Sequence, residues 1–252
     1  MASIFDLHIH TTKGSPDSSL TPEELVAECK RIGLTGVMVT EHVGWPRHDF
    51  DAFARAQDIV LIRGLELYTP LGHIIALGLE EHVGGIGGGI EAVEKVRQEV
   101  DRVGGFLILA HPFRFLFDIP GYYKQNILFR DHDPAPLTVE EATNHPVFQL
   151  VHEVEVVNGA NIETENLFTK QVAASLGQRG TGGSDAHSLH GVGKGTTVFP
   201  GEIRHARDLM DALRAREYYP LEGFHVGRPV SYLEGKSFDN SLLRPLGSPI
   251  KA

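Results

Sequence analysis

Histidine, aspartate and glutamate residues recur along the chain in short motifs whose side chains suit metal binding. They are His8, His10, Asp17, His42, Glu66, His73, His111, Asp185 and His187. Imidazole nitrogens and carboxylate oxygens in this mixture bind Zn²⁺, Mn²⁺ or Fe²⁺. Such ions in a cluster can generate hydroxide at neutral pH and neutralise an anionic oxygen. The set therefore predicts a hydrolytic metal centre.

Taken one at a time, these residues have ordinary structural explanations. His8 and His10 lie two positions apart on a strand-like segment and share a face, yet a lone His-x-His is a weak signal. Asp17 sits in a Ser-Pro-Asp-Ser-Ser segment, where aspartate commonly forms a turn. Glu66 ends an apolar segment, where a buried carboxylate needs a cation nearby. The joint occurrence of all nine residues is what favours a metal centre.

Short apolar segments alternate with helix-like segments over most of the chain. We expect strands at 4–9, 35–40, 59–67, 73–78, 105–110, 154–157, 180–183 and 195–199, and helices at 21–33, 90–103, 163–176 and 203–214. This alternation indicates an α/β fold with a parallel sheet, and the number of units favours a barrel over an open sheet. The motif residues fall at or just past strand ends, and the carboxyl-terminal face of a barrel carries its active site.

The chain has 252 residues, enough for one large α/β barrel. We expect a single barrel domain over 1–252, with an aromatic-rich insertion at about 112–150 and a tail from about 225 that wraps the outside. Long connections at the active-site face are commonly lids. A few helices with a small core of their own are an equal alternative for this insertion.

The composition of the chain limits the kinds of molecule that it is expected to bind. The formal charge of −10 argues against sequence-independent binding to duplex nucleic acid, but bound divalent ions would still make the site attractive to an anionic substrate. No apolar run is long enough to span a membrane, and no signal peptide precedes the first strand, so no membrane partner is expected. The single cysteine, Cys29, excludes an internal disulfide and suits a reducing cytoplasm. The sequence does not specify the oligomeric state.

Together the motifs resemble the PHP phosphoesterases, named for polymerase and histidinol phosphatase. The resemblance covers most of residues 4–215 and includes the opening His-x-His, the Ala-His-Pro at His111 and the Ser-Asp-x-His at Asp185. It implies a distorted (βα)₇ TIM-like barrel with a trinuclear site of Zn, Mn or Fe. In this scheme one ion is held by His8, His10, Glu66 and Asp185, a second by Glu66, His73 and His111, and a third by Asp17, His42 and His187.

One position departs from the family pattern. The family usually has Thr-Asp-His where this chain has Thr40-Glu41-His42. Glu41 is one methylene longer than aspartate, so we expect its contact with a metal-binding histidine to be shifted. The segment after His187 is similar to small stand-alone family members, and nothing in the chain resembles a polymerase body.

The resemblance implies a phosphoesterase that hydrolyses a phosphate ester of a small metabolite or nucleotide through a metal-bridging hydroxide. Asp185, His187 and His42 are the candidate catalytic residues, with the histidines assisting proton transfer. Arg114 and Lys13 are the candidate substrate-binding cations, although simple solvent exposure would also explain them. Two other hypotheses stay open, a metal-dependent C–N hydrolase related to the amidohydrolases and a non-catalytic, metal-stabilised binding module. The sequence does not specify the substrate, the metal, or a preference for monoesters over diesters.

Overall fold

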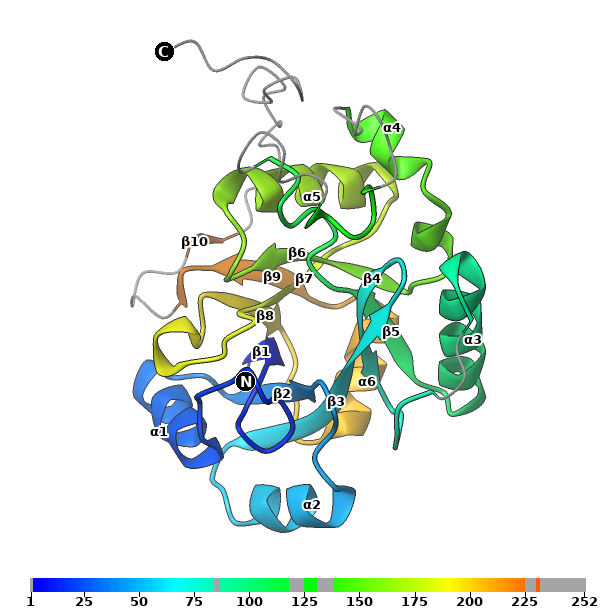
Figure 1. Ribbon diagram of the computed structural model, residues 1–252. Coiled ribbons are helices and arrows are strands. Elements are labelled where there is room, and N and C mark those ends of the chain that lie inside the picture. Colours follow the sequence, from blue (N-terminus) through cyan, green and yellow to red (C-terminus); the bar gives the residue numbers. More distant parts are fainter. Residues whose placement is uncertain (1, 84–86, 118–124, 131–137, 225–229, 232–252) are drawn as a thin grey trace.

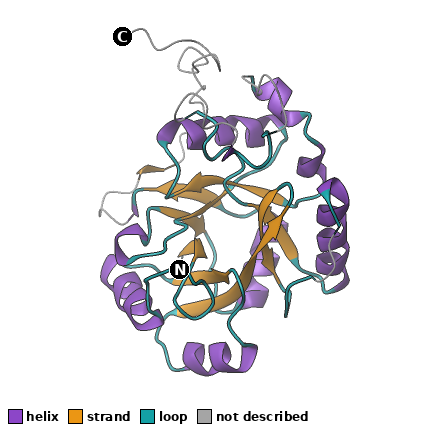
Figure 2. Cartoon of the chain, in the orientation of Figure 1, coloured by secondary structure: helices purple, strands orange, loops and turns teal. Residues whose placement is uncertain are grey.

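A strongly curled β-sheet surrounded by helices forms the body of the protein (Figures 1 and 2). The computed structural model describes residues 2–83, 87–117, 125–130, 138–224 and 230–231. Within these residues the sheet has ten strands in the order β10-β9-β8-β1-β2-β3-β4-β5-β6-β7. The strands are β1 (Ser3–Ile9), β2 (Gly36–Glu41), β3 (Val60–Thr69), β4 (Gly72–Leu77), β5 (Phe106–Leu109), β6 (Glu153–Asn158), β7 (Thr181–Gly183), β8 (Gly195–Phe199), β9 (Tyr219–Glu222) and β10 (Val230–Ser231).

Helices cover the outside of this sheet. They are α1 (Pro22–Ile32), α2 (Arg47–Arg55), α3 (Gly89–Arg102), α4 (Val139–Thr143), α5 (Glu163–Ser175) and α6 (Ala206–Ala215), with short 3-10 helices η2 (Pro146–Gln149) and η3 (Leu189–Gly191). Local signals fix the ends of α1. The Thr21 hydroxyl accepts from the backbone N–H of Glu24, whose carboxylate accepts from the N–H of Thr21, and Gly33 ends the helix with a φ of 84°.

The curled sheet closes where β7 returns to β1. The backbone N–H of His10 donates to the carbonyl of Ala186 at 3.0 Å, and the N–H of Asp185 donates to the carbonyl of His8 at 2.7 Å. Every residue of β2, β5 and β6 is buried, as expected for strands covered on both faces. The closure ties the ends of β1 and β7 together.

The barrel fold class predicted from the sequence is confirmed, but the described elements do not confirm a count of seven βα units. The pairs β1–β2, β2–β3, β5–β6 and β6–β7 are parallel, whereas β1–β8, β3–β4, β4–β5, β8–β9 and β9–β10 are antiparallel. A hairpin rather than a helix joins β3 to β4, and its turn ends at Gly72 with a φ of 112°. Glycine tolerates this conformation, which is strained for other residues.

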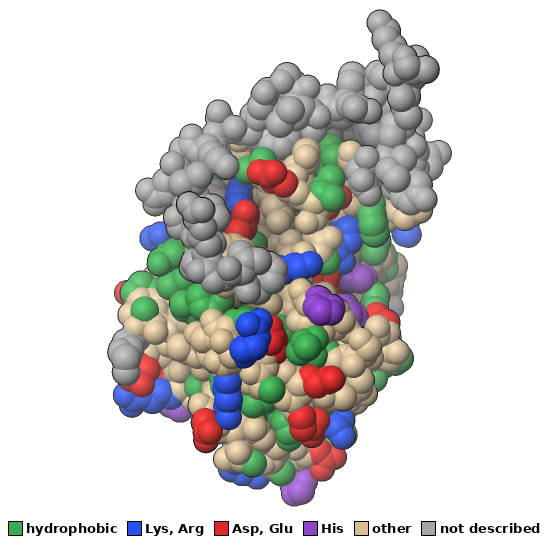
Figure 3. Space-filling view, turned by 90° about the vertical axis from the view of Figure 1, so that its left-hand side faces the viewer, with side chains coloured by type: hydrophobic (Ala, Val, Ile, Leu, Met, Phe, Trp, Pro, Cys, Tyr) green, Lys and Arg blue, Asp and Glu red, His purple; other side chains and the backbone are tan. Residues whose placement is uncertain are grey.

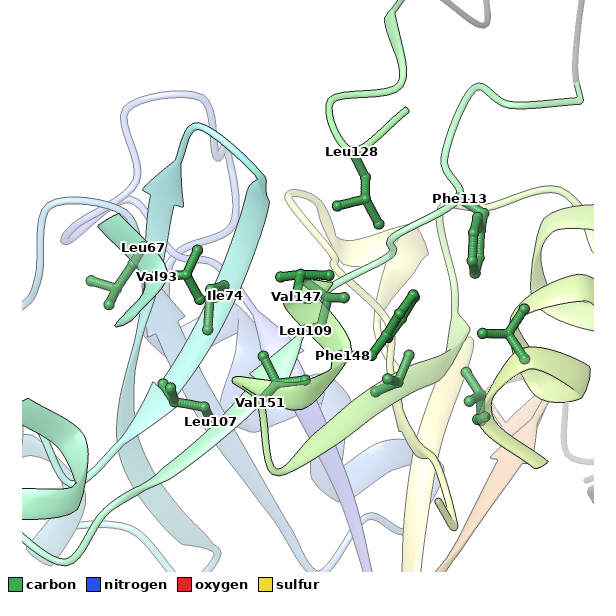
Figure 4. Packing of buried hydrophobic residues seen from close by; sticks show 14 of the residues in the cluster. Leu67, Ile74, Val93, Leu107, Leu109, Phe113, Leu128, Val147, Phe148 and Val151 are labelled. Carbon is green, nitrogen blue, oxygen red and sulfur yellow. The ribbon is translucent and has the colours of Figure 1, made fainter. Parts of the chain in front are cut away.

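The largest hydrophobic cluster lies between the sheet and helices α3 and α5, and Figure 4 shows part of it. Leu67, Ile74, Leu107 and Leu109 enter from neighbouring strands. The described parts of the predicted lid contribute to the same cluster through Phe113, Leu116, Leu128, Phe129, Val147 and Phe148. Residues 118–124 and 131–137 of that lid, and residues 225–229 and 232–252 of the tail, lie outside the described residues. The lid and the wrapping tail therefore stay predictions.

No helix in the described part of the chain is long and apolar enough to cross a membrane.

Candidate metal centre

The predicted metal-binding residues meet at one end of the barrel, although they are far apart in sequence. Four groups have ligand atoms that all lie within 4.8 Å of one another, namely His8–His10–Glu66, His8–His111–Asp185, Glu66–His73–His111 and His10–His42–His187. The groups share His8, His10, Glu66 and His111, so they form one continuous cluster. In the space-filling view, histidine side chains reach the surface beside arginine or lysine side chains (Figure 3).

Glu66, on β3, lies in the middle of this cluster and is only 1% exposed. Its Oε1 lies 3.2 Å from His8 Nε2, 3.0 Å from His73 Nδ1 and 3.2 Å from His111 Nε2, and its Oε2 lies 3.3 Å from His10 Nε2 and 3.1 Å from His42 Nδ1. Five imidazoles therefore surround one carboxylate. Its two oxygens face different histidines, which is the arrangement that a carboxylate bridging two ions requires.

Asp185 supplies a second buried carboxylate from the loop after β7. Its Oδ1 lies 3.5 Å from His8 Nε2 and 3.3 Å from His10 Nε2. A glycine at 183 makes this approach possible, because a Cβ there would lie 2.3 Å from the Cβ of His8. Asp185 and His111 also have positive φ angles of 53° and 29°, a conformation that is uncommon for residues other than glycine. The fold therefore holds both side chains in place against local backbone preference.

The third predicted group faces solvent. Asp17 Oδ2 lies 3.3 Å from His42 Nε2 and 3.4 Å from His187 Nε2, and the Asp17 side chain is 55% exposed. The His10 ring stacks against both of the other histidines, with its centroid 4.3 Å from that of His42 and 4.3 Å from that of His187. His10 thus connects this open group with the buried groups around Glu66.

The electrostatics of the cluster favour cations. Burial would raise the pKa of Glu66, but the charge of His8 and the close approach of His111, His42 and His73 hold that pKa well below its usual value. Burial would likewise raise the pKa of Asp185, but His8, His10 and Arg114 lower it well below its usual value. Burial and the charge of His8 lower the pKa of His10 to about 4, although neighbouring carboxylates oppose this. Ionised carboxylates beside a neutral imidazole are a suitable donor set for divalent ions.

Buried nitrogens give a direct test of whether ions would fit. Among the described residues, His8 Nε2, His10 Nε2 and His42 Nδ1 are buried without a hydrogen bond of acceptable geometry. Buried polar atoms are normally satisfied, so three unsatisfied atoms in one cluster require an explanation. Divalent ions between these nitrogens and the carboxylates of Glu66 and Asp185 would provide it. The residues present fit a multinuclear metal centre.

Supporting residues orient the histidines. Glu155, on β6, lies 3.0 Å from His8 Nδ1, and the hydroxyl of Ser15 lies 3.0 Å from His10 Nδ1. Each contact directs the opposite ring nitrogen toward Glu66, as partners of metal-binding histidines do. Neither residue was among the sequence candidates. A carboxylate inside the buried run Glu153–Asn158 was the available signal for Glu155, because such a group needs a partner.

Glu41 reaches the cluster through Ser15. Its Oε2 accepts from the Ser15 hydroxyl at 2.6 Å and from the backbone N–H of Thr11 at 3.1 Å, and its Oε1 accepts from the Thr11 hydroxyl. The longer side chain therefore contacts His10 indirectly, through the serine.

The two predicted substrate-binding cations differ in placement. Arg114 points into the cluster, where its Nη2 donates to Asp185 Oδ2 at 2.6 Å and to Asn158 Oδ1 at 2.7 Å, and its Nε donates to Asn161 Oδ1 at 2.9 Å. Lys13 is exposed, and no ion pair joins its ammonium group to the described residues of the cluster. Tyr68, which the sequence did not single out, is 53% exposed, with its ring centroid 4.9 Å from that of His42 and 4.4 Å from that of His73.

Comparison with solved structures shows the same fold in proteins of low sequence identity. The lesion-specific endonuclease PfuEndoQ from Pyrococcus furiosus is 16% identical, with a TM-score of 0.58, covering 87% of this chain and 58% of that one. A provisionally named metal-dependent phosphoesterase from Bifidobacterium adolescentis is 15% identical, with a TM-score of 0.52 and coverages of 73% and 88%. An amidohydrolase from Chromobacterium violaceum, solved with sulfate and without metal, is 18% identical, with a TM-score of 0.52 and coverages of 83% and 96%.

No curated protein sequence matches the chain significantly. Family models, by contrast, match most of it. Residues 6–179 match the PHP domain, and residues 163–218 match the PHP-associated region. The first match includes seven of the nine predicted metal-binding residues and the second includes the other two. A metal-dependent hydrolase is the class that the fold, the cluster and these matches support, and the chain belongs to the PHP domain family.

Proposed function

We propose that the protein is a metal-dependent phosphoesterase, a phosphatase or phosphodiesterase, that acts on a small phosphorylated metabolite or nucleotide. We further propose that the nine clustered residues hold three divalent ions, of Zn, Mn or Fe. The observation that carries the proposal is the position of Arg114, whose guanidinium donates to Asp185 at the edge of the histidine cluster. A guanidinium beside a cationic centre is well suited to bind phosphoryl oxygens.

When bound, the ions would activate a water molecule and neutralise the phosphoryl oxygens. The chain's own residues supply orientation and proton transfer. Nη2 of Arg114 stays on Asp185 and Asn158, while Nη1 has no hydrogen bond among the described residues and is available to a phosphoryl oxygen. The arginine would thus fix the phosphoryl group relative to the cluster without leaving its own partners.

His187 is the better placed of the two candidate proton donors. Its Nδ1 lies 3.0 Å from the backbone carbonyl of Asp185, which can only accept, so Nδ1 carries the hydrogen and Nε2 presents a lone pair. Its side chain is 30% exposed, whereas that of His42 is 7% exposed. Released from the ion and protonated at Nε2, this solvent-facing imidazole could pass a proton to a departing alkoxide.

The principal alternative is hydrolysis of a C–N bond, because the Chromobacterium protein is named an amidohydrolase. The open group of Asp17, His42 and His187 favours phosphoester chemistry, because it adds a third position to the two ions that C–N hydrolysis in related barrels needs. The sulfate in that same protein has the tetrahedral shape of phosphate, which supports anion binding in this fold. A short oligonucleotide stays among the candidate substrates because of the endonuclease relative.

The test is turnover by protein reconstituted with Mn²⁺, Fe²⁺ or Zn²⁺. The substrates are 4-nitrophenyl phosphate, bis-4-nitrophenyl phosphate, histidinol phosphate, nucleoside bisphosphates, a single-stranded oligonucleotide and an N-acetyl amino acid. The double variant Asp185→Ala/His187→Ala should lose turnover and bound metal, while Lys30→Ala, at an exposed ion pair with Asp58, should retain both. Metal-dependent cleavage of the amide alone would contradict the proposal, and fewer than two bound ions per chain would contradict the ligand assignment.

A further inference from the structure

A cavity adjoins the cluster of histidines and carboxylates, on the side of Arg114. Its volume is about 140 Å³, and His73, His111 and Arg114 are among the residues that line it. The rest of its wall is mainly apolar, with Leu71 from the β3–β4 hairpin, Leu109 from β5, and Ile127 and Leu128 from the segment beyond the Ala-His-Pro motif. If the cluster binds the phosphoryl group of a substrate, the alcohol part of that substrate would therefore lie against aliphatic side chains.

The polar atoms of the wall are already satisfied within the chain. Asn126 is buried, its Nδ2 donates to the carbonyls of Pro112 and Arg114 at 2.8 Å each, and its Oδ1 accepts from the N–H of Phe129 at 2.8 Å. Both amide hydrogens of Asn126 are therefore used, so the side chain has no donor left for a hydroxyl-rich ligand. Gln125, which is exposed, is the other neutral amide in the wall. A sugar or polyol inside the cavity would lose more hydration than these few polar groups replace.

Four exposed apolar side chains lie close in sequence to residues of the site. Exposed large hydrophobic side chains follow closely after residues of the site, namely Val43 after His42, Tyr68 after Glu66, Phe115 after Arg114 and Leu189 after His187. Their exposed fractions run from 40% to 66%. Single exposed apolar residues are common, but the Tyr68 ring packs against His42 and His73, and Phe115 lines the cavity. Part of the approach to the centre is therefore apolar.

We infer that the substrate is a phosphate monoester of a compact apolar alcohol, carrying one ring or a short branched alkyl group that occupies this cavity. The inference rests on the proposed phosphoesterase function and deepens it. In the reaction water adds to phosphorus, the P–O bond to the alcohol breaks, and the departing alkoxide takes a proton. The products are the alcohol and inorganic phosphate.

Size supports this assignment. An apolar cavity of roughly 150 Å³ admits a benzene-sized ring. A nucleoside, with both a sugar and a base, is considerably larger than the 140 Å³ available and brings hydroxyl groups that the wall cannot satisfy. The cavity therefore discriminates among phosphate esters by the bulk and polarity of the alcohol.

The test compares benzyl phosphate with methyl phosphate, glucose 6-phosphate and adenosine monophosphate on the metal-loaded enzyme, because all four esters release a primary alkoxide. Benzyl phosphate should have a kcat/KM at least about tenfold above glucose 6-phosphate and adenosine monophosphate, since burial of its ring favours binding. Ile127→Trp should fill the cavity, lowering kcat/KM for benzyl phosphate by about tenfold or more while sparing methyl phosphate. Leu71→Trp fills it from the β3–β4 hairpin, and Val103→Trp, an exposed apolar position after α3, is the matched control.

Binding gives a second readout that does not require turnover. Benzylphosphonate should bind more tightly than methylphosphonate by calorimetry, and Ile127→Trp should remove the difference. If esters are cleaved but both filling variants fold, by thermal melting, and cleave benzyl phosphate as fast as wild type does, only this inference is overturned. Only this inference is likewise overturned if adenosine monophosphate is the best substrate. Absence of cleavage of every ester overturns the proposed function as well.

Discussion

Glu155 contacts Nδ1 of His8, the ring nitrogen opposite the one that faces Glu66. Its Oε1 lies 3.0 Å from His8 Nδ1, and its Oε2 accepts the backbone N–H of His111 at 3.0 Å and the side-chain amide of Asn158 at 2.8 Å. One carboxylate on β6 therefore positions side chains from β1 and from the end of β5, and through Asn158 it also reaches Arg114. The Glu155 carboxylate therefore supports both the proposed metal-binding residues and the proposed substrate-binding arginine.

Glu155→Gln should weaken metal binding by about 10- to 100-fold, the usual effect of losing such a partner. The amide can still accept from His8 Nδ1, but its NH₂ group then meets the N–H of His111, a donor facing a donor. Competition with a chelator measures the affinity, and Glu163→Gln, at an exposed position on α5, is the control. Unchanged affinity in Glu155→Gln would show that His8 needs no such partner.

Arg114→Lys should lower kcat/KM for the best phosphate ester by about 100-fold, because a lysine cannot donate in two directions from one planar group. Bound metal should stay near the wild-type level, since Asp185 keeps its histidine neighbours. Steady-state kinetics together with metal analysis checks both parts. A parallel loss of metal would assign Arg114 to holding Asp185 rather than to binding the substrate.

Glu41→Asp, which restores the residue usual in the family, should lower the free energy of unfolding by about 1–3 kcal/mol. The shorter side chain cannot reach both Thr11 and Ser15, so a buried donor loses its acceptor. Urea denaturation measures the change, with Glu41→Gln as a comparison that keeps the length. Equal stability of the aspartate variant would mean that the loop from Thr11 to Ser15 adjusts at little cost.

His152 should make stability depend on pH. Burial and nearby Arg97 lower its pKa to about 4, below the usual 6.5, and its Nδ1 accepts from the N–H of Leu107. The unfolded chain therefore binds a proton below pH 6.5 that the folded chain binds only near pH 4, so stability is full above pH 6.5 and falls between these values. After allowance for partial exposure the loss is on the order of 1–2 kcal/mol.

Comparison with His152→Asn, which retains an acceptor but does not titrate, isolates this effect from the histidines of the cluster. Urea denaturation at pH 7.5, 6, 5 and 4.5 should show wild type losing stability relative to the variant as pH falls. A constant difference across this range would contradict the assignment.

Local signals account for what the sequence predicted well. Thr21, Pro22 and the acidic residues after them located the start of α1, and apolar runs located the strand before His42 and the strand that contains Glu66. That second strand continues past Glu66 to Thr69, beyond the predicted end. The antiparallel pairing of β1 with β8 was missed because it joins residues nearly two hundred positions apart, such as Ser3 and Phe199. Helix α2 was missed too, since it begins at Arg47, directly after Pro46, without a side-chain cap.

The residues of the site also divide into those that the sequence indicated and those that only the structure shows. Residue types and motif context pointed to the nine clustered side chains and to Arg114. Glu155 and Ser15 escaped notice because their function depends on the ring nitrogens that they touch, which only the packed structure reveals. The cavity beside the cluster arises from segments about fifty residues apart, Leu71 and Ile127 among them, and no local pattern encodes it.

The closure of β7 against β1 also sets an order of events during synthesis. His8 and His10 leave the ribosome first, yet the buried groups need Asp185, and the open group needs His187. Because the contacts that seat Asp185 join it to the backbone of His8, the nascent chain has no complete cluster until Asp185 and His187 have emerged. Loading of the proposed ions would therefore follow the synthesis of β7, and a truncated product that ends before β7 should bind divalent ions weakly.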